Sequence, residues 1–93
     1  MNDPGDADRA PLALDEWPYL QIADRLEDRI RRGEFGTDGK LPATAYLAGH
    51  YGVSQYVIRH AREELLRRNL VVHRLGEGWF ARVPLRLRRA GFP

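Results

Sequence analysis

The sequence contains no cysteine, one methionine and a single lysine, Lys40. Without cysteine the chain has no disulfide, no thiolate metal ligand and no cysteine nucleophile. It also lacks an apolar run near the roughly 18–20 residues that span a bilayer. Residues 1–6 are acidic and contain no apolar stretch, which is unlike a secretory signal peptide. These absences predict a protein of the cytoplasm that does not contact a membrane.

The chain is short, with 93 residues. Domains commonly have about 100–200 residues, so this length predicts a single domain. A chain of this size buries only ~60% of its unfolded surface or a little more, which requires a compact core. The length leaves no room for a barrel, for a doubly wound nucleotide-binding fold, or for a separate small-molecule effector domain. We therefore expect no effector domain.

Groups that carry out catalysis or bind metals are sparse. The three histidines, His50, His60 and His73, show neither His-x-x-x-His nor Glu-x-x-His spacing. A structural zinc site needs four ligands, which usually include thiolates. The glycines of residues 76–78 are not followed by a predicted helix, so they do not indicate a phosphate-binding loop. We predict that the chain is not an enzyme and holds no metal and no cofactor.

The net charge of +2 conceals two ends of opposite charge. Residues 1–16 carry a net charge of −4, whereas residues 54–93 hold nine arginines and three acids, a net charge of +6. A basic half indicates a polyanionic partner, most often nucleic acid. The acidic residues 1–16 are a candidate competitor of DNA for that basic surface. A solvated arginine-rich surface that results from codon bias explains the composition equally well.

Hydrophobic periodicity predicts three helices followed by two strands. Pro18 suits the first turn of the first helix, Gly52 favours positive φ in the turn after the second, and Ser54 is a good N-cap for the third. The predicted elements are helices over residues 18–32, 43–50 and 54–68 and strands over 70–73 and 79–83, with a glycine-rich turn at 74–78. Flanking them are a disordered acidic tail over residues 1–16 and a basic tail over residues 84–93.

The second and third predicted helices are separated by a short turn with a glycine, which is typical of a helix-turn-helix. In that motif the second helix lies in the major groove, and its N-terminal residues meet base edges. We expect Val57, Ala61 and Leu65 to face the core, so that Gln55 and Arg59 project outward. Glutamine pairs bidentately with adenine and arginine with guanine. A three-helix core without any ligand would show the same pattern.

The predicted hairpin offers a second contact, because Arg74 and the glycine-rich turn can approach a DNA backbone or a minor groove. A tight turn needs glycine whether or not it binds DNA. The expected partner is double-stranded DNA. The candidate DNA-binding residues are Lys40, Thr44, Ser54, Gln55, Tyr56, Arg59, Arg74, Gly76 and Gly78.

Motifs along most of the chain resemble one family. They are Tyr19–Ala23, Arg29–Gly33, Lys40–Pro42, Leu47-Ala48, Tyr51–Ser54, Val57–Arg59, Leu65, Leu70–Val72 and Gly76–Phe80. Over about residues 17–83 the sequence resembles the GntR-family winged helix-turn-helix domain. The resemblance implies an α+β fold with a three-helix core and a C-terminal β-hairpin wing. It also implies a bacterial transcription factor associated with the nucleoid, usually a repressor, that binds a palindromic operator as a homodimer.

The chain departs from the family pattern on the side that would read DNA. Family members usually continue the Leu-Pro with Ser-Glu-Arg-Glu, but residues 43–46 read Ala-Thr-Ala-Tyr. The arginine that commonly contacts DNA in the family is therefore replaced by Ala45. Gln55 and Tyr56 stand where the family usually has arginine and threonine, and Trp79 replaces the usual threonine of the wing.

These departures leave two hypotheses open. Arg59 matches the family arginine of the recognition helix, which favours DNA binding to a different operator. The alternative is a winged-helix protein–protein interaction module whose DNA reading is lost or altered. In that case Tyr46, Tyr51, Tyr56 and Trp79 would form an aromatic contact surface.

Overall fold

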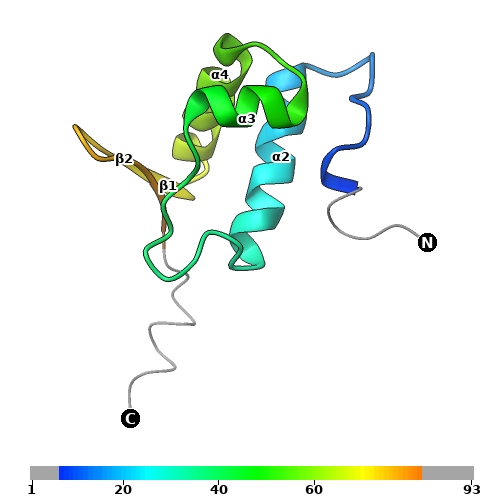
Figure 1. Ribbon diagram of the computed structural model, residues 1–93. Helices are drawn as coiled ribbons and strands as arrows, with labels where there is room; N and C mark the ends of the chain where they lie inside the picture. Colours follow the sequence, from blue (N-terminus) through cyan, green and yellow to red (C-terminus); the bar gives the residue numbers. More distant parts are fainter. Residues whose placement is uncertain (1–6, 83–93) are drawn as a thin grey trace.

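The computed structural model describes residues 7–82. In chain order they form helices α2 (Pro18–Arg31), α3 (Thr44–Tyr51) and α4 (Gln55–Arg67), then strands β1 (Val71–Arg74) and β2 (Gly78–Ala81). The antiparallel hairpin extends from one side of the three helices, and the N-terminal segment lies on the other side (Figure 1). The predicted three-helix core with a β-hairpin wing is confirmed. The predicted basic tail over residues 84–93 lies outside the described residues, as do residues 1–6 and 83.

Helix α2 supplies one wall of the core. Pro18 occupies its first turn, where the amide would have no intrahelical partner. Its buried residues recur at three- and four-residue spacing and are Gln21, Ile22, Ala23, Leu26 and Ile30. Its exposed side carries ion pairs between residues four apart, such as Arg31 with Glu27 at 2.6 Å. The amphipathic pattern therefore sets which side of α2 packs against α3 and α4.

The turn between α3 and α4 has the predicted chemistry. Gly52 adopts a left-handed conformation with φ of 67°, and the amide of Val53 donates to the carbonyl of Ala48 at 3.0 Å. Ser54 caps α4, because its hydroxyl oxygen accepts from the amide of Val57 at 3.2 Å. Both predictions for this turn are confirmed. The turn holds the start of α4 in a fixed position relative to α3.

Helix α4 packs the expected apolar stripe against the core. Ile58, Ala61 and Leu65 are fully buried, while Val57 is only partly buried. Val57 packs against the core cluster, so the prediction that Val57, Ala61 and Leu65 face the core is confirmed, and Ile58 is buried more deeply than Val57. Leu66, on the same helix, is 47% exposed. The depth of burial along α4 follows from its packing on α2, which a single-helix pattern does not define.

The hairpin is attached to the helices by a third extended segment. Its strands pair from Val71 with Ala81 to Arg74 with Gly78. Lys40 forms a bridge with Phe80, and the amide of Ala81 donates to the carbonyl of Gly39 at 2.7 Å. The segment that precedes α3 thus continues the two-stranded sheet by one short antiparallel piece. A hairpin alone is marginally stable in water, so this pairing stabilises it.

The N-terminal segment differs from the expected disordered tail in the part that the structure describes. The side chain of Asp8 is only 6% exposed. Its carboxylate accepts from the hydroxyl of Tyr51 at 2.8 Å, lies 2.7 Å from His50 Nε2 and pairs with Arg29 at 3.5 Å. A composition poor in large apolar residues had indicated disorder, but these polar contacts order the segment instead.

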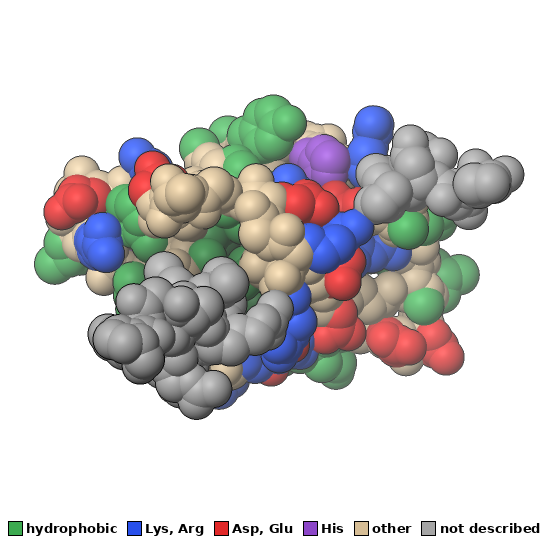
Figure 2. Space-filling model, turned by 90° about the horizontal axis from the view of Figure 1, so that it is seen from below, with side chains coloured by type: hydrophobic (Ala, Val, Ile, Leu, Met, Phe, Trp, Pro, Cys, Tyr) green, Lys and Arg blue, Asp and Glu red, His purple; other side chains and the backbone are tan. Residues whose placement is uncertain are grey.

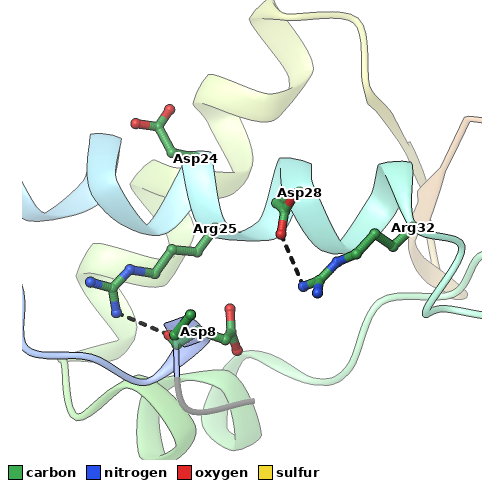
Figure 3. Close-up of a pocket in the computed structure, with 6 residues that line it drawn as sticks. Asp8, Asp24, Arg25, Asp28 and Arg32 are labelled. Carbon is green, nitrogen blue, oxygen red and sulfur yellow. Dashed lines mark hydrogen bonds and ion pairs between the residues drawn. The ribbon is translucent and has the colours of Figure 1, made fainter. Parts of the chain in front are cut away.

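Two side chains of α2 also hold the backbone of this segment. Arg25 donates to the carbonyls of Asp8 and Ala10, and Figure 3 shows it reaching toward Asp8. Gln21 accepts from the amide of Ala13 at 2.7 Å and donates back to its carbonyl at 2.8 Å. The described acidic segment therefore lies on α2 and α3 and does not cover the exposed side of α4.

Candidate nucleic-acid interface

The N-terminal half of α4 presents its polar side chains outward. Gln55, Tyr56 and Arg59 are exposed, whereas Ile58, between them in sequence, is fully buried. The buried stripe holds the helix on the core, so the exposed side chains project from a rigid support. Ser54 is also exposed, and its cap leaves the hydroxyl hydrogen available to donate to a phosphate. The positive end of the α4 dipole lies at the same place.

Ion pairing divides the basic side chains into two groups. Five arginines form ion pairs with carboxylates at 2.6–3.5 Å: Arg29, Arg31, Arg32, Arg67 and Arg68. Within residues 7–82, Lys40, Arg59, Arg62 and Arg74 form no such pair. Figure 2 looks at the end of the molecule where α2 finishes, and basic and acidic side chains are interleaved there. The paired arginines are thus locally neutralised.

Four of the unpaired cations, Lys40, Arg59, Arg62 and Arg74, belong to elements that touch one another. Arg59 and Arg62 lie three residues apart on α4, and Arg74 ends β1. Lys40 precedes α3 and bridges to Phe80 of β2. Cations without an acidic partner in the described chain are therefore found on α4, on the hairpin and on the segment beside it, which are the elements that the sequence predicted to contact DNA. Arg9, Arg25 and Arg82 form no ion pair within the described chain either, but Arg25 and Arg82 donate to neutral oxygens.

The wing residues lie around the hairpin turn. Arg74 is exposed, and its guanidinium lies 4.3 Å from the centroid of the Phe80 ring. Gly76 is exposed in the turn with φ of 78°, and Gly78 has φ of 123°. A Cβ atom on Gly78 would lie 3.4 Å from Cε of Lys40, so Lys40 reaches the base of the wing. Among the predicted residues, Lys40, Arg74, Gly76 and Gly78 are thus brought together.

Thr44 has a different environment from the other predicted residues. It is partly buried at the start of α3, and its hydroxyl oxygen accepts from Arg62 at 2.6 Å. Desolvation by burial, with the nearby charge of Arg59, lowers the pKa of Arg62. Sequence reasoning did not single out Arg62. The three-residue spacing from Arg59, which places both on one side of a helix, is the signal that would have found it.

Aromatic side chains surround the start of α4. Trp17, Tyr19, Tyr56 and His60, with Pro18 and Val57, line a shallow hollow of about 270 Å³. Tyr56 stands edge-on to His60 with ring centroids 4.3 Å apart, and it is 63% exposed. Trp17 is 70% exposed, and sequence reasoning did not identify it.

The four aromatic residues of the interaction hypothesis have different neighbours. Tyr46 stacks on His50, and Tyr51 is hydrogen-bonded to Asp8. Tyr56 belongs to the hollow described above, and Trp79 stacks on His73 with ring centroids 4.3 Å apart. Tyr46 and Tyr51 both contact His50, so the four residues fall into three groups by their neighbours.

The described helices contain no segment long and apolar enough to cross a membrane. Over residues 7–82 there is also no group of three or more histidine, aspartate or glutamate side chains placed to hold a metal ion.

A capped helix that exposes polar side chains from a helix-turn-helix, with a wing beside it, is the architecture of a winged helix-turn-helix DNA-binding domain. Residues 18–81 match the family described as bacterial regulatory proteins, gntR family. The chain belongs to this family, as the sequence motifs predicted.

Relatives and solved structures agree with this assignment. The chain is 33% identical over 64 residues to the mannosyl-D-glycerate transport/metabolism system repressor MngR of Escherichia coli K12, covering 69% of this chain and 27% of that protein. It is 38% identical over 69 residues to the HTH-type transcriptional repressor NanR of Klebsiella aerogenes, covering 74% and 26%. The chain thus spans about a quarter of the length of these relatives. The crystal structure of AraR(DBD) in complex with operator ORX1 is similar, with a TM-score of 0.67 and 28% identity over 78% of this chain and 89% of that chain.

Proposed function

We propose that this chain binds operator DNA as part of a transcriptional repressor in the cytoplasm, at the nucleoid. Helix α4 would lie in the major groove, and the turn between β1 and β2 would lie on the backbone or in the minor groove. The observation that carries the proposal is the exposure of Gln55, Tyr56 and Arg59 beside cations that have no acidic partner in the described chain. Side chains on a rigid support lose little conformational entropy on binding, which favours specific recognition.

Each exposed residue has a role that its chemistry supports. Gln55 pairs with adenine and Arg59 with guanine, because both side chains match a base edge bidentately. Ser54 donates to a phosphate near the N-terminus of α4. Lys40 and Arg74 neutralise phosphates on either side of the wing, and the glycines of the turn allow the backbone to come close. Tyr56, at the edge of the aromatic hollow, contacts the sugar-phosphate backbone.

The proposed complex contains two copies of the chain on a palindromic operator. A single small module buries only about 600–1,000 Å² on DNA, which gives weak binding by itself. Two modules on half-sites about 10–10.5 base pairs apart, or a multiple of this, would bind the same side of the duplex. A footprint with two equivalent half-sites at such a spacing is the expected result.

The test uses a duplex that the purified protein selects from a random pool and a scrambled duplex of equal length. The wild-type protein should prefer the selected duplex and lose affinity with salt at a slope of about −0.9 per neutralised phosphate. Arg59→Ala should weaken binding to the selected duplex roughly 5–150-fold and relax its sequence preference. Arg67→Ala is the matched control, because Arg67 is on the same helix but is paired with Glu64. Equal preference for both duplexes, or equal losses in the two variants, would refute the proposal.

The protein–protein interaction hypothesis makes the opposite prediction. Replacing Gln55 and Arg59 together by alanine would then leave partner capture unchanged. Tyr51 and Trp79 are only partly exposed and contact Asp8 and His73 within the chain, so they contribute less to the aromatic surface that this hypothesis requires. We therefore favour DNA binding.

A further inference from the structure

Arg62 lies where three parts of the proposed interface meet. It belongs to α4, its guanidinium donates to the hydroxyl of Thr44 at the start of α3, and it lies 4.8 Å from the centroid of the Trp79 ring on β2. Figure 1 shows that α3, α4 and the hairpin adjoin on this side of the molecule. One side chain therefore joins the helix-turn-helix to the wing.

The environment of Arg62 is unusual for an arginine. Its Nε atom is buried and has no hydrogen-bond partner among the described residues, and it forms no ion pair there. Burying a guanidinium without an acidic partner carries a free-energy cost, which the hydroxyl of Thr44 and the face of Trp79 offset only in part. The contacts depend on the planar shape of the guanidinium, because the same group bonds to an oxygen and lies over a ring.

Buried residues anchor the base of the wing, because Val71 of β1 is fully buried in the core and Phe80 of β2 is 7% exposed. Its strands have four residues each, and a two-stranded hairpin is marginally stable alone. Backbone pairing with residues 39–41 attaches one strand. Trp79 links β2 to Arg62 of α4, and its ring stacks on His73 across the hairpin with planes 7° apart. A change at Arg62 would therefore reach both strands through Trp79.

We propose that Arg62 is a positioning residue that sets the wing and the start of α3 relative to α4. In this role it acts through Trp79 and Thr44 and need not touch DNA. Its geometry brings Arg74 and the turn glycines to the same duplex that Gln55 and Arg59 read. The inference rests on the proposed function for its effect on DNA binding, but the orientation of the wing is a property of the free protein.

The first test measures wing orientation without DNA, by residual dipolar couplings of backbone amides. Arg62→Lys keeps the positive charge but removes the planar fork, so the couplings of β1 and β2 should change relative to those of α4. Arg67→Lys, on the same helix, should leave them unchanged. Thr44→Val removes only the hydroxyl that accepts from Arg62. If Arg62→Lys does not fold, the couplings of β1 and β2 are measured in Thr44→Val instead. Unchanged wing couplings in Arg62→Lys, or in Thr44→Val where Arg62→Lys does not fold, would overturn the proposal.

The second test measures affinity for the selected duplex. Arg62→Lys should bind about tenfold more weakly, since it loses a charge-assisted hydrogen bond and a cation–π contact. The salt slope should change by less than about one phosphate because the charge remains. Trp79→Leu should cause a similar loss, and the double variant should be no weaker than the weaker single variant, because both act through one contact. Losses that multiply would mean that the two residues act independently and would overturn the proposal.

Failure of the proposed function would be seen in the binding of DNA by the wild-type protein, and not in the dipolar couplings. If the wild-type protein binds selected and scrambled duplexes equally, the DNA-reading proposal is refuted. The dipolar couplings of the free protein then decide by themselves whether Arg62 orients the wing.

Discussion

The buried carboxylate of Asp8 allows a quantitative prediction. Its two oxygens contact Tyr51, His50 and Arg29 at 2.8, 2.7 and 3.5 Å. Burial raises the pKa of the Tyr51 phenol, so the hydroxyl stays protonated and donates to the carboxylate. Replacing Asp8 by alanine would leave three polar groups without this partner.

The expected loss follows from the geometry. A hydrogen bond that involves a charged group contributes about 1.5–3 kcal/mol, and an orphaned buried partner costs a similar amount. The side chains of His50 and Arg29 are 20% and 14% exposed, so water replaces part of what is lost. We expect Asp8→Ala to lower the free energy of unfolding by about 2 kcal/mol. In a domain of this size that corresponds to a fall of roughly 8–16 °C in Tm.

Thermal unfolding followed by circular dichroism at 222 nm measures this change. Asp15→Ala is the matched control, since Asp15 is an exposed acid of the same segment. A second readout is trypsin cleavage after Arg9, which should become faster in Asp8→Ala as the segment detaches. If both variants melted within a degree or two of the wild-type protein and were cleaved at its rate, the assignment of Asp8 as the anchor would be refuted.

Two further predictions concern the stability of the fold. Gly39→Ala would place a Cβ atom 2.9 Å from the carbonyl oxygen of Ala81 at a φ of 72°, whereas the Cβ atom of Gly33→Ala, at a φ of 74°, meets nothing within 4 Å. Urea unfolding should therefore show that Gly39→Ala loses about 1–3 kcal/mol more unfolding free energy than Gly33→Ala. Equal losses in the two variants would exclude the clash. The hydrogen bond from Arg31 is the main cause that lowers the pKa of Glu27. Ionised Glu27 therefore stabilises the fold above its unfolded-state pKa, and this stabilisation is lost as pH falls through the lower folded-state pKa. The difference in unfolding free energy between the wild-type protein and Glu27→Gln, below about 1 kcal/mol at pH 6, should then shrink toward pH 3, and a constant difference would contradict this cause.

Much of the fold could be predicted because its signals are local. Pro18, Gly52 and Ser54 each act through their own backbone or through residues a few positions away, and the structure places each where the sequence indicated. The apolar side of α4 was predictable for the same reason, but the degree of burial was not. Both Val57 and Ile58 lie on the apolar stripe of the helix, and the angle at which α4 packs on α2 decides that Ile58 is fully buried and Val57 only partly.

The candidate site was predictable only in part. The outward direction of Gln55 and Arg59 follows from the helix period, so the sequence indicated it. The helix period does not indicate the roles of Arg62 and Asp8, because their hydrogen-bond partners lie 18 and 42–43 residues away along the chain. Composition treats a buried acid and a solvated acid alike, so residues 7–16 were expected to be disordered.

The sequence by itself determined the order of the elements, their caps and turns, and the membership in the gntR family, since these rest on short-range periodicity and on motifs in fixed register. Only the tertiary structure decided which arginines are neutralised by carboxylates and which remain unpaired in the described chain. The sequence gives the charge of each arginine, but whether a carboxylate lies near enough to neutralise it depends on which elements pack side by side. Tertiary packing therefore decides which basic residues of the sequence are available on the surface that we propose for DNA.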